Sequence, residues 1–142
     1  MIVLDTNVVS ELTRQCPEEN VLSWLDSIPT HEVVTTAVTA AELLYGVTRL
    51  PDGHRKVALT QAVHALLNYD LQGRVEPFDA IAASHYEIVV SDREKAGRPI
   101  SVADAQIAAI CRKLDASLAT RNTKDFEHIG LKLIDPWDAR VS

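Results

Sequence analysis

Short β-branched apolar segments alternate with longer amphipathic segments along the whole chain. Runs of valine, isoleucine and threonine are typical of strands, and five such segments are predicted at 1–4, 33–36, 74–78, 117–120 and 131–134. Parallel neighbours in a sheet need a crossover connection, and helices of the intervening length supply one. The alternation therefore predicts an α/β fold whose parallel sheet is covered by helices on both faces.

The segments between the predicted strands carry apolar residues at helical spacing. Helices are predicted at 6–13, 18–28, 39–50 and 57–67, and again after Asp79 and after Ser101. Asp79 and Ser101 are residue types that cap helices, and Gly97-Arg98-Pro99 separates these last two helices. We interpret Asp79 as a structural cap rather than a site residue.

The length and composition fit one compact unit. With 142 residues and 46% hydrophobic content, the chain can bury one core, and we expect a single domain over 1–142. Apolar runs fall short of the roughly 20 residues that cross a bilayer, and the N-terminus lacks the basic start of a signal peptide. We expect a cytoplasmic protein without membrane contact. Cys16 and Cys111 have no C-x-x-C partner, so we interpret both as packing residues.

The formal charge of −6 argues against a protein that grips nucleic acid through general electrostatics, because such binding draws on a basic surface. That sum counts every carboxylate as a bare negative charge. A bound divalent cation would reverse the sign of the field around its ligands. The charge therefore limits nonspecific binding and leaves metal-dependent catalysis open.

Acidic and amide side chains follow the predicted strands at one edge of the sheet. Asp5 ends the first strand, Glu42 lies in the first turn after the second, and Asp104 lies in the first turn of the late helix, while Asn122 and Asp125 follow the fourth strand. In parallel sheets the functional crevice lies at this edge. Gathered carboxylates repel one another unless they are protonated, paired or bridged by a hard cation. Mg²⁺, with Mn²⁺ as the alternative, is the predicted ion, because no histidine spacing suits zinc.

Each acidic residue also has a structural interpretation when it is taken singly. The segments 39–42 and 101–104 fit the helix capping box, and a lone aspartate at a strand end often accepts backbone hydrogen bonds in a loop. The combination, not any one residue, predicts an acidic metal-binding cleft.

The sequence resembles PIN-domain toxins of the VapC kind, and especially their FitB-like branch. The resemblance begins at MIVLDTNVVSEL and continues through TAVTAAELLYGV, RVEPFDAIAA and ISVADAQIAAI to SLATRNTKDF and LIDPW. These segments follow the family's order over almost the whole chain. The resemblance implies a PIN-like three-layer α/β/α sandwich with a central, mostly parallel sheet of four to five strands.

The same resemblance implies a Mg²⁺-dependent endoribonuclease with Asp5, Glu42 and Asp104 as metal ligands. Many relatives have an aspartate where this chain has Asn122, so the fourth site residue is either Asn122, which we rank first, or Asp125. A neutral fourth group weakens a second ion more than the first. Whether one or two ions bind is left open.

Further side chains near this edge are secondary site residues. Thr6 and Asn7 begin the first helix, where they either cap it or hold a ligand carboxylate or phosphate. Arg121 either contacts the RNA backbone or pairs with Asp125 or Glu42. Ser101 caps the helix that carries Asp104. Four basic residues form either a rim of the site or ordinary solvated surface, namely Arg93, Lys95, Arg98 and Lys124.

The resemblance also implies partners. Family members form homodimers, and an apolar stripe with Leu44, Tyr45 and Val47 is either core or dimer interface. They are bound by a small antitoxin, here VapB-like or FitA-like, whose tail covers the acidic cleft. The toxin reaches operator DNA only through this antitoxin. The implied assembly is a homodimer or a higher assembly that contains the antitoxin. The expected substrate is RNA.

Two other functions compete with the ribonuclease. One is a catalytically weak PIN module that acts as an antitoxin-bound co-regulator at operator DNA. The other is a phosphatase of the haloacid dehalogenase type, which also begins with a strand ending in aspartate. That class needs D-x-D, and Asp5-Thr6-Asn7 lacks the second acid.

Overall fold

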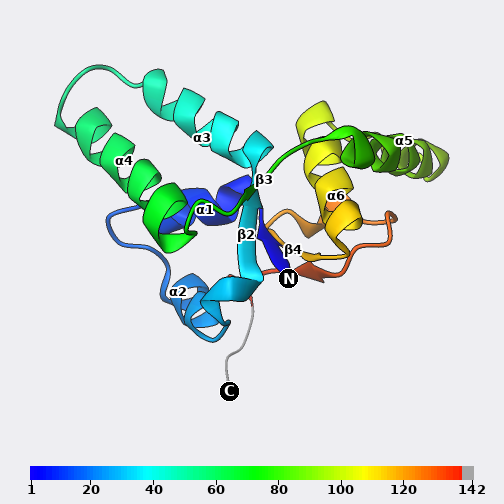
Figure 1. Cartoon of the computed structure of the whole chain (residues 1–142), viewed down its shortest axis with the longest axis horizontal. Coiled ribbons are helices and arrows are strands. Elements are labelled where there is room, and N and C mark those ends of the chain that lie inside the picture. The colour runs from blue at the N-terminus through cyan, green and yellow to red at the C-terminus, as the bar shows by residue number, and fades with distance from the viewer. Residues whose placement is uncertain (139–142) are drawn as a thin grey trace.

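A five-stranded sheet lies between two layers of helices in the computed structural model, which describes residues 1–138 (Figure 1). The strands are β1 (Ile2–Leu4), β2 (Val33–Thr36), β3 (Val75–Glu76), β4 (Ser117–Ala119) and β5 (Leu133–Ile134). The helices are α1 (Thr6–Leu12), α2 (Glu19–Asp26), α3 (Ala37–Thr48), α4 (His54–Ala65), α5 (Ala80–Lys95) and α6 (Val102–Leu114). Short helical turns are η1 (Thr30–Glu32), η2 (Leu66–Asp70) and η3 (Thr123–Phe126).

The sheet has the order β3-β2-β1-β4-β5, and every neighbouring pair is parallel. The first strand is therefore the central one, with Val3 paired to Val34 on one side and to Leu118 on the other. The Asp5 amide continues the ladder by donating to the Ala119 carbonyl at 2.9 Å. The predicted α/β class and the three-layer arrangement around a parallel sheet are confirmed.

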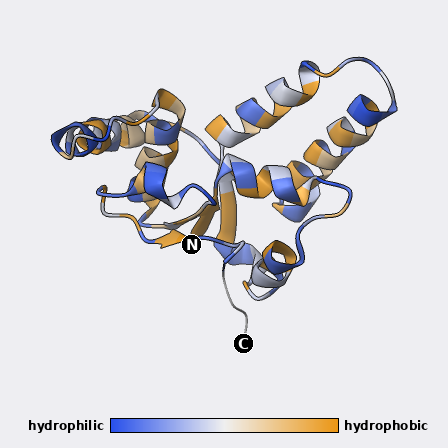
Figure 2. Ribbon diagram, turned by 180° about the vertical axis from the view of Figure 1, so that it is seen from behind, coloured by the Kyte–Doolittle hydropathy of each residue, from blue (hydrophilic) through white to orange (hydrophobic). Residues whose placement is uncertain are grey.

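Alternate residues of the strands pack into two different helical layers, as the two-residue period of a strand requires. Leu4, Val33 and Ala119 belong to a core cluster with residues of α1 to α4. Val3, Val34 and Leu118 belong to a second cluster with α5, α6 and the segment around Phe126. Because both faces of the central strands are covered, most of β1 and β4 and the first half of β2 consist of buried apolar residues, and they form the orange centre of Figure 2.

The helix ends differ from the prediction in places where a cap was misplaced. α3 begins at Ala37 rather than residue 39, because the Thr36 side chain accepts from the Thr39 amide at 3.0 Å and so caps the helix. α4 begins at His54, three residues before the predicted start, and continues through the π-helical turn η2. Asp79 caps α5 as predicted, accepting from the Ala82 amide at 3.0 Å.

The prediction that both cysteines are packing residues is right for one of them. Cys111 is fully buried in the α6 core, whereas Cys16 is exposed in the connection between α1 and α2, where its packing assignment is wrong. Among residues 1–138 there is no helix with the length and hydrophobicity that crossing a lipid bilayer requires.

Leu118 tests how strongly the sheet depends on the α5 and α6 layer. Its side chain is 0% exposed in the middle of β4. Leu118→Ala should lower the free energy of unfolding by about 2–5 kcal/mol, because it removes buried apolar contact and leaves a cavity. Urea unfolding followed by circular dichroism measures this loss. Val57→Ala, at a side chain that is 57% exposed on α4, is the control and should change stability by no more than about 0.5 kcal/mol.

Candidate active site

The Asp5 carboxylate is buried where the central strand ends, with its residue only 3% exposed. One oxygen accepts from the Thr6 amide at 2.9 Å. The other accepts from the Thr120 hydroxyl at 2.7 Å and from the Asn7 side-chain amide at 3.3 Å. These three donors come from α1 and from the residue after β4, so the orientation of the carboxylate is fixed by the two adjoining strand ends.

Glu42 reaches the same edge from α3. Its Oε1 accepts from the Thr6 hydroxyl at 3.1 Å, and that hydroxyl also lies 3.1 Å from the Thr39 hydroxyl. The sequence predicted Glu42 in the first turn of this helix. Because α3 begins at Ala37, Glu42 instead lies in the second turn. The capping-box interpretation of Glu42 is wrong, since Thr36 caps this helix.

Asp104 lies in the first turn of α6, and the N-terminal ends of α3 and α6 are at the same end of the sheet (Figure 1). The Ser101 side chain accepts from the Asp104 amide at 3.2 Å, which confirms Ser101 as the cap. The Asp104 side chain is only partly buried, so it is reachable from solvent while it is held at a defined helical position.

The acidic groups act on one another electrostatically. Burial raises the pKa of Asp5, and the negative charge of Glu42 raises it further, against the hydrogen bonds that lower it. Burial also raises the pKa of Asp104, with additional increases from the charges of Asp5 and Asp125. Four carboxylates from segments far apart in the sequence therefore share one electrostatic environment.

The donor chemistry of this edge suits a hard divalent cation. Neighbouring carboxylates that repel one another are stabilised by Mg²⁺ or Mn²⁺, and their oxygen atoms offer nothing that favours zinc. Within residues 1–138, no three His, Cys, Asp or Glu side chains are arranged as a formed coordination shell. The side chains fit the ion by their type and their shared edge, and they would have to turn towards one another to enclose it.

The residues after β4 continue the edge. The backbone amide of Asn122 donates to the Thr120 hydroxyl at 3.1 Å, and the backbone amide of Asp125 donates to the backbone carbonyl of Asn122 at 3.0 Å. The Arg121 amide donates to Asn7 Oδ1 at 3.1 Å, while its guanidinium lies 4.8 Å from the ring centre of Trp137. Arg121 thus stacks on an aromatic ring, and the described residues give it no ion pair with Asp125 or Glu42.

Two residues that the sequence did not indicate as site residues, Thr120 and Thr39, support the acidic edge, and Arg93 differs from its prediction. Thr120 and Thr39 are both fully buried and bind Asp5 and Thr6 respectively. Arg93, predicted as a rim or solvated residue, is only 5% exposed, so that prediction is wrong, whereas Lys95, Arg98 and Lys124 are exposed. Thr120 falls within the strand predicted at 117–120, so no sequence pattern places its hydroxyl at the site, and nothing in the sequence distinguishes Arg93 from its exposed neighbours.

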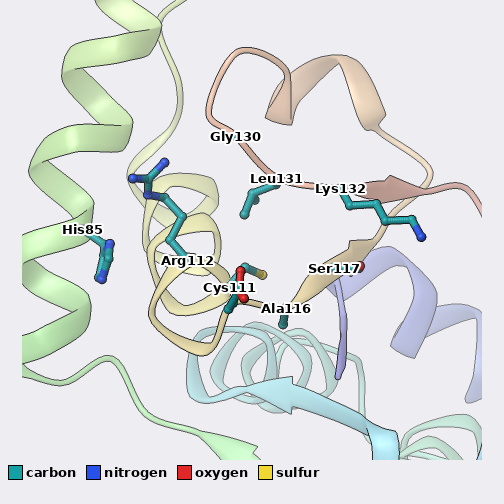
Figure 3. Close-up of a pocket in the computed structure, with 9 residues that line it drawn as sticks. His85, Cys111, Arg112, Ala116, Ser117, Gly130, Leu131 and Lys132 are labelled. Atoms are coloured by element: carbon teal, nitrogen blue, oxygen red, sulfur yellow. The ribbon is translucent and has the colours of Figure 1, made fainter.

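A pocket of about 340 Å³ lies away from this edge, beside the amino ends of β4 and β5 (Figure 3). Its lining includes His85, Arg112 and Lys132, with Asp115 as its one carboxylate. The pocket therefore has the opposite charge character from the acidic edge and shares none of the predicted site residues.

The likeness of this chain to known proteins extends over nearly its whole length. The PIN domain family model matches residues 2–132. VapC ribonuclease Y4jK of Sinorhizobium fredii is 38% identical over 138 residues, which are 97% of this chain and 99% of that protein. Toxin FitB of Neisseria gonorrhoeae is 37% identical over 137 residues, 96% of this chain and 99% of the toxin. The structure of FitAB bound to an IR36 DNA fragment has a TM-score of 0.91 at 35% identity and 99% coverage of each chain.

The burial of Asp104, together with repulsion from Asp5 and Asp125, should be visible as a pH-dependent loss of stability in EDTA. The pKa of Asp104 is raised above its ordinary 3.8 in the folded chain. At pH values between the unfolded and the folded pKa, the folded state therefore binds more protons than the unfolded state, and stability falls as the pH rises through this range. Asp104→Asn should therefore be more stable than wild type at neutral pH, by up to about 1 kcal/mol. Thermal unfolding across the pH range measures the difference.

The Asp104→Asn difference should disappear at acidic pH, where the wild-type carboxyl is protonated. Saturating Mg²⁺ should reverse the order by stabilising wild type more than the variant. A wild type that is the more stable protein in EDTA at every pH would show that the Asp104 charge is not under repulsion.

The Thr120 hydroxyl should control the affinity of the site for a cation. Thr120→Val removes the 2.7 Å hydrogen bond that orients Asp5, and we expect Mn²⁺ affinity, measured by calorimetry, to fall about tenfold. Thr35→Val is the matched control, because Thr35 is equally buried but its hydroxyl donates to the Leu4 carbonyl. Equal Mn²⁺ affinity in the two variants would refute this role of Thr120.

Proposed function

Because this chain belongs to the PIN-domain family of VapC-type toxin ribonucleases, we propose that it is a Mg²⁺-dependent endoribonuclease and the toxin of a type II toxin–antitoxin system. The observation that supports the proposal is the electrostatic coupling of Asp5 with Glu42 and of Asp104 with Asp5 at one edge of the sheet. Such mutual repulsion is typical of a site that functions with a cation bound.

We assign the metal-holding role to Asp5, Glu42 and Asp104, with Mn²⁺ as a substitute for Mg²⁺. When bound, the ion would lower the pKa of a water molecule and offset the negative charge that develops during phosphodiester hydrolysis. The expected products carry 5′-phosphate and 3′-hydroxyl ends.

The surrounding side chains orient the carboxylates. Thr120 and Asn7 donate to the same Asp5 oxygen, which directs the lone pairs that remain. Thr6 donates to Glu42 and thereby links α1 to α3. Ser101 caps α6 and holds the backbone of Asp104. Support of this kind keeps ligand groups close to their working positions before the ion arrives.

Two residues remain candidates for a fourth oxygen donor. Asp125 is supported by its charge, which raises the pKa of Asp104. Asn122 is exposed at the start of η3, and no hydrogen bond of its side chain occurs among the described residues. An amide there would supply a neutral donor, and the carboxylate of Asp125 a charged one, so the choice determines how well a second ion is held.

RNA would approach the acidic edge past Arg121. Its backbone amide donates to Asn7 and its guanidinium is stacked on Trp137, so the guanidinium is already partly ordered before RNA binds. A guanidinium placed in this way is suited to a phosphate of the RNA backbone. Lys95 and Lys124 add exposed positive charge, whereas the exposed Arg98 is paired with Glu127 at 3.0 Å.

The antitoxin is proposed to be a small VapB-like or FitA-like protein whose basic tail covers the acidic edge. The solved relative FitAB is a complex bound to a DNA fragment. The net charge of −6 favours a basic partner by electrostatic complementarity, and we propose that operator DNA is reached only through it. The exposed Leu44 and Tyr45 on α3 suit a homodimer contact, which larger antitoxin complexes would retain.

One observation favours the alternative of a catalytically weak module that only regulates through its antitoxin. The carboxylates within residues 1–138 do not form a coordination shell as they stand. Such a protein would bind its antitoxin normally and leave RNA intact. Activity separates the two functions, because both predict the same fold and the same partner.

The central test is incubation of purified, antitoxin-free protein with total RNA in Mg²⁺, in Mn²⁺ or in EDTA. We expect cleavage in either metal, none in EDTA, and new 5′-phosphate ends on sequencing. Asp104→Asn should lower the rate on the order of a hundredfold or more, because it removes a charged ligand without altering the side chain's size. The same ends at the same rate from wild type and variant would exclude this site.

The loss of activity in Asp104→Asn is informative only if the variant is folded. Asp104→Asn should melt no lower than wild type in EDTA and should still bind the antitoxin. RNA that stays intact with wild type in all three buffers would favour the regulatory module.

A further inference from the structure

Arg93 is a buried charge in the last turns of α5. It is 5% exposed, and its guanidinium donates to three backbone carbonyls. The Nε atom donates to the Arg98 carbonyl at 2.7 Å, and Nη1 donates to the carbonyls of Lys124 and Glu127 at 3.1 Å and 3.0 Å. The Arg98 amide returns a hydrogen bond to the Arg93 carbonyl at 2.9 Å.

These carbonyls belong to two loops that both lead to the acidic edge. Arg98 lies in the connection that ends at Ser101, the cap of the helix that carries Asp104. Lys124 and Glu127 lie on either side of Asp125 in and after η3. The two loops are far apart in the sequence, and one planar side chain holds both. The spacing between Asp104 and Asp125 therefore depends on Arg93.

The charge of Arg93 has no carboxylate partner within ion-pair distance among residues 1–138. Burying a guanidinium costs free energy because it loses hydration, and here three backbone carbonyls, rather than a counter-charge, offset that cost. The hydrogen bonds of Arg93 to the two loops fix the orientation of its guanidinium.

We propose that Arg93 is a positioning residue, which holds the loops of Asp104 and Asp125 at the separation that a divalent cation requires. This inference rests on the proposed metal-dependent function. The two loops are contacted by two different nitrogens, Nε and Nη1, and the single nitrogen of lysine does not reproduce this fixed spacing even though it keeps the charge.

Arg112 provides a matched control for a purely structural clamp. Its Nη1 also donates to a backbone carbonyl, that of Ile129 at 2.8 Å. Arg112 lies in the last turn of α6, at the end of the helix opposite Asp104. Its loss should loosen the chain between η3 and β5 without altering the acidic edge.

The experiment compares Arg93→Lys and Arg112→Lys with wild type in the full-length chain. Mn²⁺ affinity is measured by calorimetry at neutral pH, and thermal unfolding in EDTA records the stability of each protein. We expect Arg93→Lys to bind Mn²⁺ at least about tenfold more weakly, while Arg112→Lys binds it as wild type does. Wild-type affinity in Arg93→Lys, or equal losses of affinity in both variants, overturns the proposal.

Hydrogen exchange of the wild-type chain gives a second measurement if Arg93→Lys does not fold. Mn²⁺ should slow exchange in both 97–100 and 123–128, because Arg93 couples these loops, and leave 130–132 unchanged. Protection in only one of the two loops overturns the proposal. A wild type that binds no Mn²⁺ at all is a different result, since it removes the metal-dependent function itself.

Discussion

The burial of one carboxylate at the end of the central strand is the constraint on which the rest of the structure depends. Asp5 follows β1, whose neighbours on both sides are parallel strands, so three strand ends converge around it. A charge withdrawn from water in this way must be satisfied by nearby donors. The hydroxyl of Thr120 and the first residues of α1 meet that need, and they define the edge to which α3 and α6 bring their acids.

At the acidic edge, hydrogen bonds hold the acidic residues in place while their negative charges repel one another. Threonine, asparagine and serine side chains hold the backbones and one carboxylate in place, whereas the acids themselves remain mutually unfavourable. The acids are held in place, but their negative charges are not neutralised. A cation or a basic peptide segment would bind here because either supplies positive charge. The proposed metal-dependent catalysis and the proposed inhibition by an antitoxin would therefore depend on the same uncompensated negative charge.

Periodicity and residue type were sufficient to predict the layers, the strand positions and the edge that gathers Asp5, Glu42 and Asp104, because these follow from local pattern and from the rules of parallel sheets. Helix starts were less predictable: Thr36 and Thr39 are both good caps, and only tertiary contact with Thr6 distinguishes them. Arg93 and Thr120 could not be assigned from sequence, since their roles depend on partners 31 and 115 residues away.

The sheet order also has a consequence for the timing of synthesis. The central strand emerges first from the ribosome, but one of its two neighbours, β4, begins only at Ser117. Contacts between such distant segments form late in folding. A partly translated chain that lacks β4 has no Thr120 to hold Asp5, so the acidic edge is completed only after β4 has been made and has paired with β1. Any activity of this edge would thereby be withheld until these distant segments have come together.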